Sequence, residues 1–193
     1  AYLDQGGRLL YFAEQGVDCD LDALLARYGV QVDPGVVADA KMNAGQPYLV
    51  VTPYLGDSPI VKPLKQQQNN VIFASTRSLT MLRVGMAEGV STLPLVVSGP
   101  GAWVDLQMNE TPTLDPGEKS GNLVLAAQIA RDTGGASGKR SDEARLIVMG
   151  DADILIGSFG YEPNRNLVLN SFAWVTQQIS RISPRSRRSS IHS

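Results

Sequence analysis

Short apolar runs alternate with amphipathic stretches along most of the chain, and this alternation predicts an α/β fold. Residues 9–12 are apolar and have the length of a short buried strand. In residues 21–28 the apolar positions recur on one helical face, and Gly29 follows as a favourable residue for ending a helix. The chain is therefore expected to begin with a strand and a helix.

The middle of the chain is rich in strand signals. β-Branched residues between positions 30 and 40 are interrupted by Asp33, Pro34 and Gly35, which predict a turn. Ser58 is a favourable cap and Pro59 suits a first helical turn, so one short turn of helix is expected there. Further apolar runs predict strands at residues 48–52, 70–74, 93–97 and 123–129.

The last part of the chain contains the clearest strand and helix signals. Residues 144–149 predict a buried strand, and Gly150 and Asp151 follow it directly. A long helix is expected over residues 164–179, with Asn164 as its N-cap. The apolar stripe that would pack this helix on a sheet consists of Val168, Phe172, Val175 and Ile179.

Length and charge narrow the class of protein. The 193 residues predict one domain over residues 1–180, and no segment has the ~20 consecutive apolar residues that cross a bilayer. A formal charge of −2 supplies no broad positive field, so nucleic acid is not expected as a partner. Residues 181–193 are rich in arginine and serine, which predicts a flexible basic tail; it is either a solvated linker or a contact with an anionic surface.

The start of the chain indicates a fragment of a longer protein. Residues 1–8 resemble the end of a helix that is closed by glycine, and the helix itself is missing. Neither an initiating methionine nor a signal peptide precedes them.

Several kinds of catalytic chemistry lack the residues they need. Cys19 is the only cysteine and His192 the only histidine, so a zinc site and a Ser-His or Cys-His nucleophile are both unexpected. The glycine-rich segment 134–141 is expected to be a mobile loop, and its spacing fails the phosphate-binding pattern because Arg140 separates Lys139 from the serine. The sequence therefore predicts no catalytic residues, no cofactor and no metal held by nitrogen and sulfur.

The carboxylates that follow the strand at 144–149 are the best remaining candidate site. Ligands of open α/β sheets bind beyond the carboxyl ends of strands, where Asp151 and Asp153 lie. Two acids there suit Mg²⁺ or Ca²⁺. In the alternative interpretation Asp151 accepts hydrogen bonds from a neighbouring loop and Asp153 caps the short turn at residues 154–156.

A second candidate site follows the strand at 93–97. Ser98, Gly99 and Gly101 precede Trp103, whose flat apolar face suits the wall of a pocket or the edge of the core. Arg77 has the chemistry to bind a carboxylate or phosphate group, or it pairs with Asp105 or Glu110.

The order of several short motifs resembles a known family. The chain is similar to the extracytoplasmic domain of GldG-type auxiliary proteins of ABC transporters, the ABC-type uncharacterised transport system family, which is related to the GIFT domain of gliding-motility and intraflagellar-transport proteins. The likeness extends to about residue 182, and no single motif is diagnostic. The matching stretches are residues 2–10, 21–30, 56–60, 74–79, 98–103, 150–153 and 164–167, with Asn170 and Trp174.

This resemblance implies a fold, a location and partners. It implies a Rossmann-like or flavodoxin-like three-layer sheet, as in class I glutamine amidotransferases, with a β-rich middle insertion. It also implies flanking transmembrane helices, a periplasmic location on the inner membrane, and the permease and ATPase subunits of the transporter as partners.

Two functions are compatible with these observations. The first is a non-catalytic sensor, scaffold or adaptor of an ABC transport system, connected with gliding motility, in which Arg77, Asp151, Asp153 and the 98–103 segment contact a ligand or partner. This function is compatible with a homo- or hetero-oligomer. The second is a metal-dependent enzyme that processes carbohydrates or phosphates through Asp151 and Asp153.

Overall fold

The computed structural model describes residues 2–17, 19–108, 111–134, 143–157 and 160–178. Its largest element is a six-stranded sheet in the order β1-β10-β9-β6-β2, in which β7 also pairs with β9. Only β1 and β10 run parallel, and the other pairings of this sheet are antiparallel. The strands are β1 (Arg8–Phe12), β2 (Val30–Val32), β6 (Leu79–Met81), β7 (Val90–Val97), β9 (Val124–Asp132) and β10 (Glu143–Met149).

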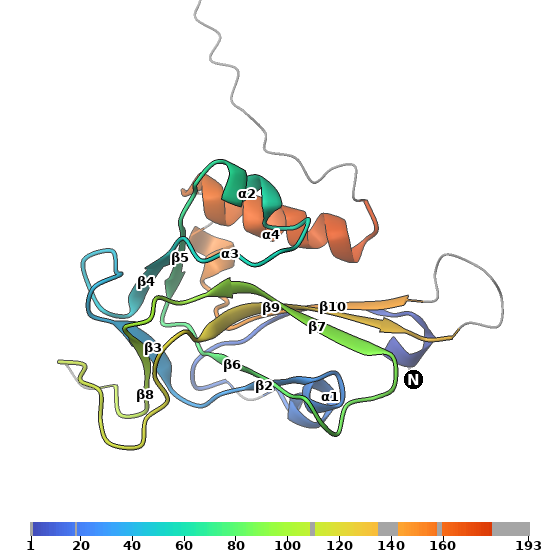
Figure 1. Ribbon diagram of the computed structural model, residues 1–193, viewed down its shortest axis with the longest axis horizontal. Helices are drawn as coiled ribbons and strands as arrows, with labels where there is room; N and C mark the ends of the chain where they lie inside the picture. The colour runs from blue at the N-terminus through green and yellow to red at the C-terminus, as the bar shows by residue number, and fades with distance from the viewer. Residues whose placement is uncertain (1, 18, 109–110, 135–142, 158–159, 179–193) are drawn as a thin grey trace, which may run out of the picture.

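Two short antiparallel pairs extend the fold at one end of the sheet (Figure 1). One pair is β3 (Val36–Asp39) with β8 (Ala102–Asp105), and the other is β4 (Leu49–Thr52) with β5 (Val71–Ala74). All four residues of β3 and all four of β8 are buried. The turn of Asp33, Pro34 and Gly35 separates β2 from β3, as predicted, and Gly35 has the positive φ of 79° that favours glycine.

Helices lie on both sides of the main sheet (Figure 1). α1 (Asp22–Arg27) lies on the side of β2 and β6, and the short 3₁₀ helix η1 (Leu3–Gln5) contacts β10. The opposite side carries α2 (Lys62–Gln66), α3 (Ile154–Gly157) and α4 (Glu162–Val175). Among the described residues, no helix has both the length and the apolar character that crossing a membrane requires.

The core has two parts because the strands of the sheet bury alternating residues on opposite faces. Ile147 belongs to the part beneath α4, together with Leu125 and Leu167. Leu146, its neighbour in β10, belongs to the part beneath α1, together with Leu25. Burial of one such leucine or isoleucine side chain contributes about 2 kcal/mol, so the two-sided burial of β9 and β10 fixes the centre of the molecule.

The prediction of a Rossmann-like or flavodoxin-like three-layer sheet is wrong. The molecule is mostly β, with a curled half-barrel sheet. A Rossmann-like sheet is built from parallel strands joined by helical crossovers, whereas β9 here has antiparallel neighbours on both edges. The β-rich middle is not an insertion either, because β6 and β7 are strands of the main sheet.

Most individual elements were predicted correctly. The expected strands at 9–12, 48–52, 70–74, 93–97, 123–129 and 144–149 correspond to β1, β4, β5, β7, β9 and β10, and the first expected helix corresponds to α1.

The start and the apolar face of the last helix differ from the prediction. α4 begins at Glu162 and its N-cap is Tyr161, so the prediction of Asn164 as N-cap is wrong. Val168 and Val175 are buried as expected, but Phe172 is 46% exposed. The predicted mobile loop at 134–141 (except Gly134), the end of the helix at Ile179 and the basic tail at 181–193 lie outside the described residues.

Candidate functional site

The carboxyl ends of β1 and β10 form one edge of the sheet. The two strands pair in parallel from Arg8 and Arg145 onward, so Phe12 lies beside Met149. The amide of Ala13 donates a hydrogen bond to the carbonyl of Met149 at 2.8 Å and continues this pairing into the following loop. The segment around Arg77 closes the edge, since its amide donates to the carbonyl of Gly150 at 2.7 Å.

Gly150 allows these segments to approach closely. A Cβ atom at this position would lie 1.9 Å from the carbonyl oxygen of Arg77 and 2.7 Å from Oγ1 of Thr76. Real side chains do not tolerate contacts this short, so only glycine fits against the main chain there. The contact between Gly150 and Arg77 therefore positions both of the charged candidates, Arg77 and Asp151, at this edge.

Asp151 is almost completely buried, with 2% of its surface exposed. Its Oδ2 accepts a hydrogen bond from the amide of Ala74 at 2.8 Å, and its Oδ1 accepts one from the amide of Ile154 at 3.2 Å. Burial raises the pKa of this carboxyl group to about 6, against the opposing effect of hydrogen bonds from the amides of Ala74, Asp153 and Ile154. Asp151 thus joins β5 to the start of α3.

Asp153 is exposed, in contrast to its neighbour. Both aspartates border a shallow pocket of about 190 Å³ whose other walls are mainly apolar. Within the described residues no three His, Cys, Asp or Glu side chains form a group that would hold a metal ion. The remaining lining residues are Leu49, Ile72, Ala74, Ile154, Tyr161 and Asn164.

Arg77 faces a different pocket, on the side of the sheet that carries α1. Its Nε donates a hydrogen bond to the carbonyl of Asp33 at 2.9 Å, and its Nη2 lies 3.5 Å from the carbonyl of Val32. The predicted alternative partner Asp105 instead accepts a hydrogen bond from the Tyr48 hydroxyl at 2.6 Å. Glu110 lies outside the described residues.

The pocket beside Arg77 has a volume of about 270 Å³, and we call it the Arg77 pocket. Loop residues after β1, the start of α1 and the turn before β3 form its walls. The residues that line it are Tyr11, Gln15, Gly16, Val17, Cys19, Leu21, Asp22, Pro34, Gly35 and Arg77.

The segment from Ser98 to Trp103 packs against a buried aspartate. The Ser98 hydroxyl is fully buried and accepts a hydrogen bond from the amide of Leu123 at 2.9 Å. A Cβ atom at Gly99 would lie 2.9 Å from Oδ2 of Asp39, and one at Gly101 would lie 3.9 Å from Oδ1. This segment therefore covers the carboxylate of Asp39 rather than joining Asp151 or Arg77.

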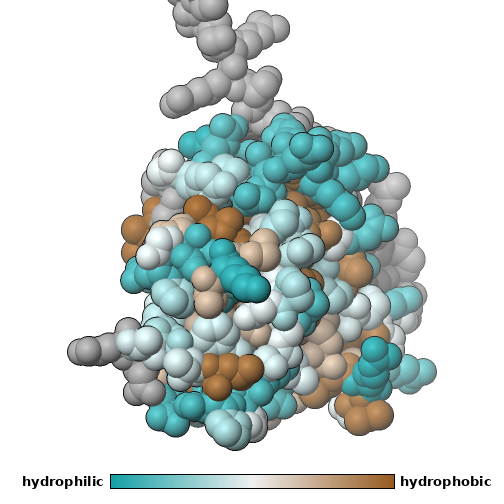
Figure 2. All heavy atoms as spheres, turned by 60° about the vertical axis from the view of Figure 1, so that its left-hand side comes forward, coloured by the Kyte–Doolittle hydropathy of each residue, from teal (hydrophilic) through white to brown (hydrophobic). Residues whose placement is uncertain are grey.

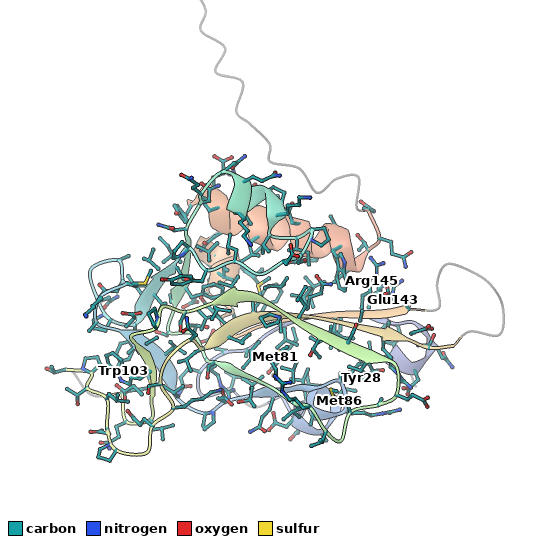
Figure 3. The ribbon with its side chains drawn as sticks, viewed as in Figure 1. Tyr28, Met81, Met86, Trp103, Glu143 and Arg145 are labelled. Atoms are coloured by element: carbon teal, nitrogen blue, oxygen red, sulfur yellow. The ribbon has the colours of Figure 1, made fainter. Side chains whose placement is uncertain are left out.

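Trp103 lies in β8, opposite Ala38 of β3, and only 6% of its surface is exposed. Figure 3 shows it at the β3–β8 end of the molecule, far from Glu143 and Arg145 at the other end of the sheet. Its indole Nε1 is buried and has no hydrogen-bond partner among the described residues. The sequence prediction placed Trp103 after a turn and did not anticipate a strand there.

Sequence reasoning missed two buried acids. Asp33 accepts hydrogen bonds from the hydroxyls of Ser78 and Thr80 at 2.5 and 2.6 Å, and it pairs with Lys119 at 2.6 Å. Oδ1 of Asp39 accepts hydrogen bonds from the amides of Lys41 and Met42, while its Oδ2 is buried without a partner among the described residues. Both lie next to turn residues, which is a weak signal because exposed aspartates are equally common there.

The molecular surface on the side of β3 and β8 carries both hydrophobic and hydrophilic side chains. Figure 2 shows isolated hydrophobic patches between hydrophilic side chains on this side of the molecule. Three exposed apolar residues lie close to the Arg77 pocket or in its wall: Val17, Leu106 and Met108 are 47%, 54% and 43% exposed.

Comparison with known proteins agrees with the family resemblance. The profile of the family described as "ABC-type uncharacterized transport system" matches residues 1–176. No curated protein matches the sequence at a significant level. The solved structure of the "mmIFT52 N-terminal domain" superposes with a TM-score of 0.62 and 16% sequence identity, covering 91% of this chain and 67% of that chain. At this identity the likeness concerns the fold alone.

Proposed function

We propose that this chain, which belongs to the family of ABC-type uncharacterized transport systems, is a non-catalytic auxiliary domain of an ABC transporter. Membership of this family implies association with transporter components. The domain comprises residues 1–180 of a longer, membrane-anchored protein and lies on the periplasmic face of the inner membrane. There it acts as a sensor, scaffold or adaptor through contacts with the permease and ATPase, in a system related to gliding motility.

The hydrogen bonds of Asp151 are the observation that supports a non-catalytic role. A catalytic carboxylate needs lone pairs that reach a substrate, a water molecule or a metal ion. Both oxygens of Asp151 are instead engaged by main-chain amides, and the side chain is 2% exposed. Asp153 alone provides too few ligands for a hard cation, which takes six or more oxygens.

The association is tested with the full-length protein in its own membrane. Tagged protein is solubilised in mild detergent and purified, and separately tagged permease and ATPase subunits are detected by immunoblot. We expect both subunits in near-equal amounts with the auxiliary protein. Recovery of the auxiliary protein without either subunit would contradict the proposed role.

The enzymatic alternative is tested by activity. The purified chain is assayed with p-nitrophenyl phosphate and p-nitrophenyl glycosides in the presence of Mg²⁺, Ca²⁺ or Mn²⁺. We expect no turnover above the buffer rate, and the same result for Asp151→Asn. Metal-dependent hydrolysis that disappears in a folded Asp151→Asn protein would establish the enzyme instead.

A further inference from the structure

The guanidinium group of Arg77 is bound along one edge only. Nε and Nη2 are directed to the main-chain carbonyls of Asp33 and Val32. No carboxylate among the described residues forms a salt bridge with Arg77. The two carbonyls fix the plane of the group without neutralising its charge, so the remaining N–H donors keep their capacity to bind an anion.

The free side of this group faces a cavity of suitable size. The Arg77 pocket, at about 270 Å³, lies at the lower limit of small-molecule sites. Burial raises the pKa of Tyr11 in its wall, and a hydrogen bond with Cys19 acts in the same direction, so that hydroxyl stays protonated and adds no negative charge to the pocket. The one acidic side chain of the lining, Asp22, is exposed, and solvent therefore screens its charge more than that of the partly buried Arg77.

Three apolar side chains lie at the edge of the pocket. Val17 belongs to the wall itself and is 47% exposed. Leu106 lies beside Gly35, since a Cβ atom at that glycine would be 3.0 Å from Cδ2 of Leu106. Met108 is reached from the wall residue Gln15, whose Nε2 lies 3.5 Å from its sulfur. Three exposed apolar side chains therefore lie in or beside the wall of the pocket that Arg77 lines.

We infer that the Arg77 pocket binds a small amphipathic organic anion. A carboxylate or phosphate group of the ligand pairs with the free N–H groups of Arg77, and its apolar part covers Val17, Leu106 and Met108. This site goes beyond the adaptor role, because it would give the domain a small-molecule input whether or not it contacts a permease.

Cys19 provides a direct measurement of occupancy. It is the only cysteine of the chain, it is exposed, and it lines the pocket. The rate of its alkylation by iodoacetamide is measured at constant ionic strength with hexanoate, hexyl phosphate or hexan-1-ol. We expect each anion that binds to slow alkylation in a saturable manner, and the neutral alcohol to have at least about a 10-fold weaker effect. Hexanoate and hexyl phosphate then distinguish a carboxylate from a phosphate ligand.

Two variants test whether Arg77 is responsible. Arg77→Gln removes the charge, and we expect about 10- to 100-fold weaker protection by the anion, because a hydrogen bond to a charged group is lost. Arg83→Gln removes the same charge at an exposed position outside the pocket and is expected to leave protection unchanged. If Arg77→Gln misfolds, Arg77→Lys replaces it in the test. This variant keeps the charge and is expected to retain part of the protection.

Three results would overturn the proposal. The first is the absence of protection by both anions at about 10 mM. The second is equal protection by hexan-1-ol, which would mean that the apolar surface alone binds. The third is unchanged protection in a folded Arg77→Gln protein, because the anion would then be bound elsewhere.

Discussion

Asp151 and Arg77 carry opposite charges at the same edge of the sheet, but their hydrogen-bonding surroundings differ. The chain segments that carry these two residues meet where the amide of Arg77 donates a hydrogen bond to the carbonyl of Gly150. Asp151 is directed toward α3 and is enclosed by amides, whereas Arg77 is directed toward the side of α1 and is bound along one edge. A carboxyl group whose oxygens accept main-chain hydrogen bonds within the fold holds two segments of that fold together. A charge that keeps free donors beside a cavity is available to a ligand.

The largest expected effect comes from the glycine that separates the two sites. Gly150→Ala would place a Cβ atom 1.9 Å from the carbonyl oxygen of Arg77, so the two segments must move apart. We expect the free energy of unfolding to fall by about 3 kcal/mol or more, measured by urea denaturation.

Gly101→Ala is the matched control for this substitution. A Cβ atom there meets nothing closer than 3.9 Å, and we expect a change within about 0.5 kcal/mol. An equal loss of stability in both variants would show that the close contact at Gly150 is not the cause.

An intermediate effect is expected when the charged side chains themselves are exchanged. Asp151→Ala leaves the amides of Ala74 and Ile154 without their acceptor in a buried place, which costs about 2 kcal/mol. Arg77→Gln removes bonds from a partly exposed side chain and is expected to cost less than about 1 kcal/mol. Thermal and urea unfolding of both variants measure the difference, and the opposite ranking would reverse the assignment of structural and binding roles.

The smallest expected effect is a dependence of the free energy of unfolding on pH, caused by the titration of Asp151. Its pKa in the folded protein is about 6, above the ordinary aspartate value of 3.8, so the folded state binds the proton more tightly than the unfolded chain does. The contribution of this group to stability therefore rises as the pH falls from 7 to 5, by about 1 kcal/mol.

Asp151→Asn lacks this titration. The difference in unfolding free energy between the wild-type protein and Asp151→Asn, measured from pH 7 to pH 5, isolates the effect from all other carboxylates. A difference that stays constant over this range would contradict a raised pKa.

The candidate residues were found in the sequence, but their roles were not. Asp151 after an apolar strand was recognisable, and so was Arg77 as an anion-binding side chain. The sequence left open whether Asp151 binds a ligand or a loop, since the amide of Ala74 comes from a segment 77 residues away. Asp33 and Asp39 were missed for the same reason, because Lys119 and Gly99 approach them only in the folded chain.

Local patterns determined most of the strands and helices of this protein, because burial of alternating or helically spaced apolar residues is a property of a short segment. They also determined the family, through short motifs in a fixed order, and the profile match over residues 1–176 confirms it. Only the tertiary structure decided the direction in which β9 pairs with β7 and β10, and with it the mostly β fold. It also decided that Asn164 bonds to the main chain of Ile72 rather than capping a helix, and that Arg77 keeps free donors. Pairing direction and hydrogen-bond partners depend on residues far apart in the chain, which a local pattern does not encode.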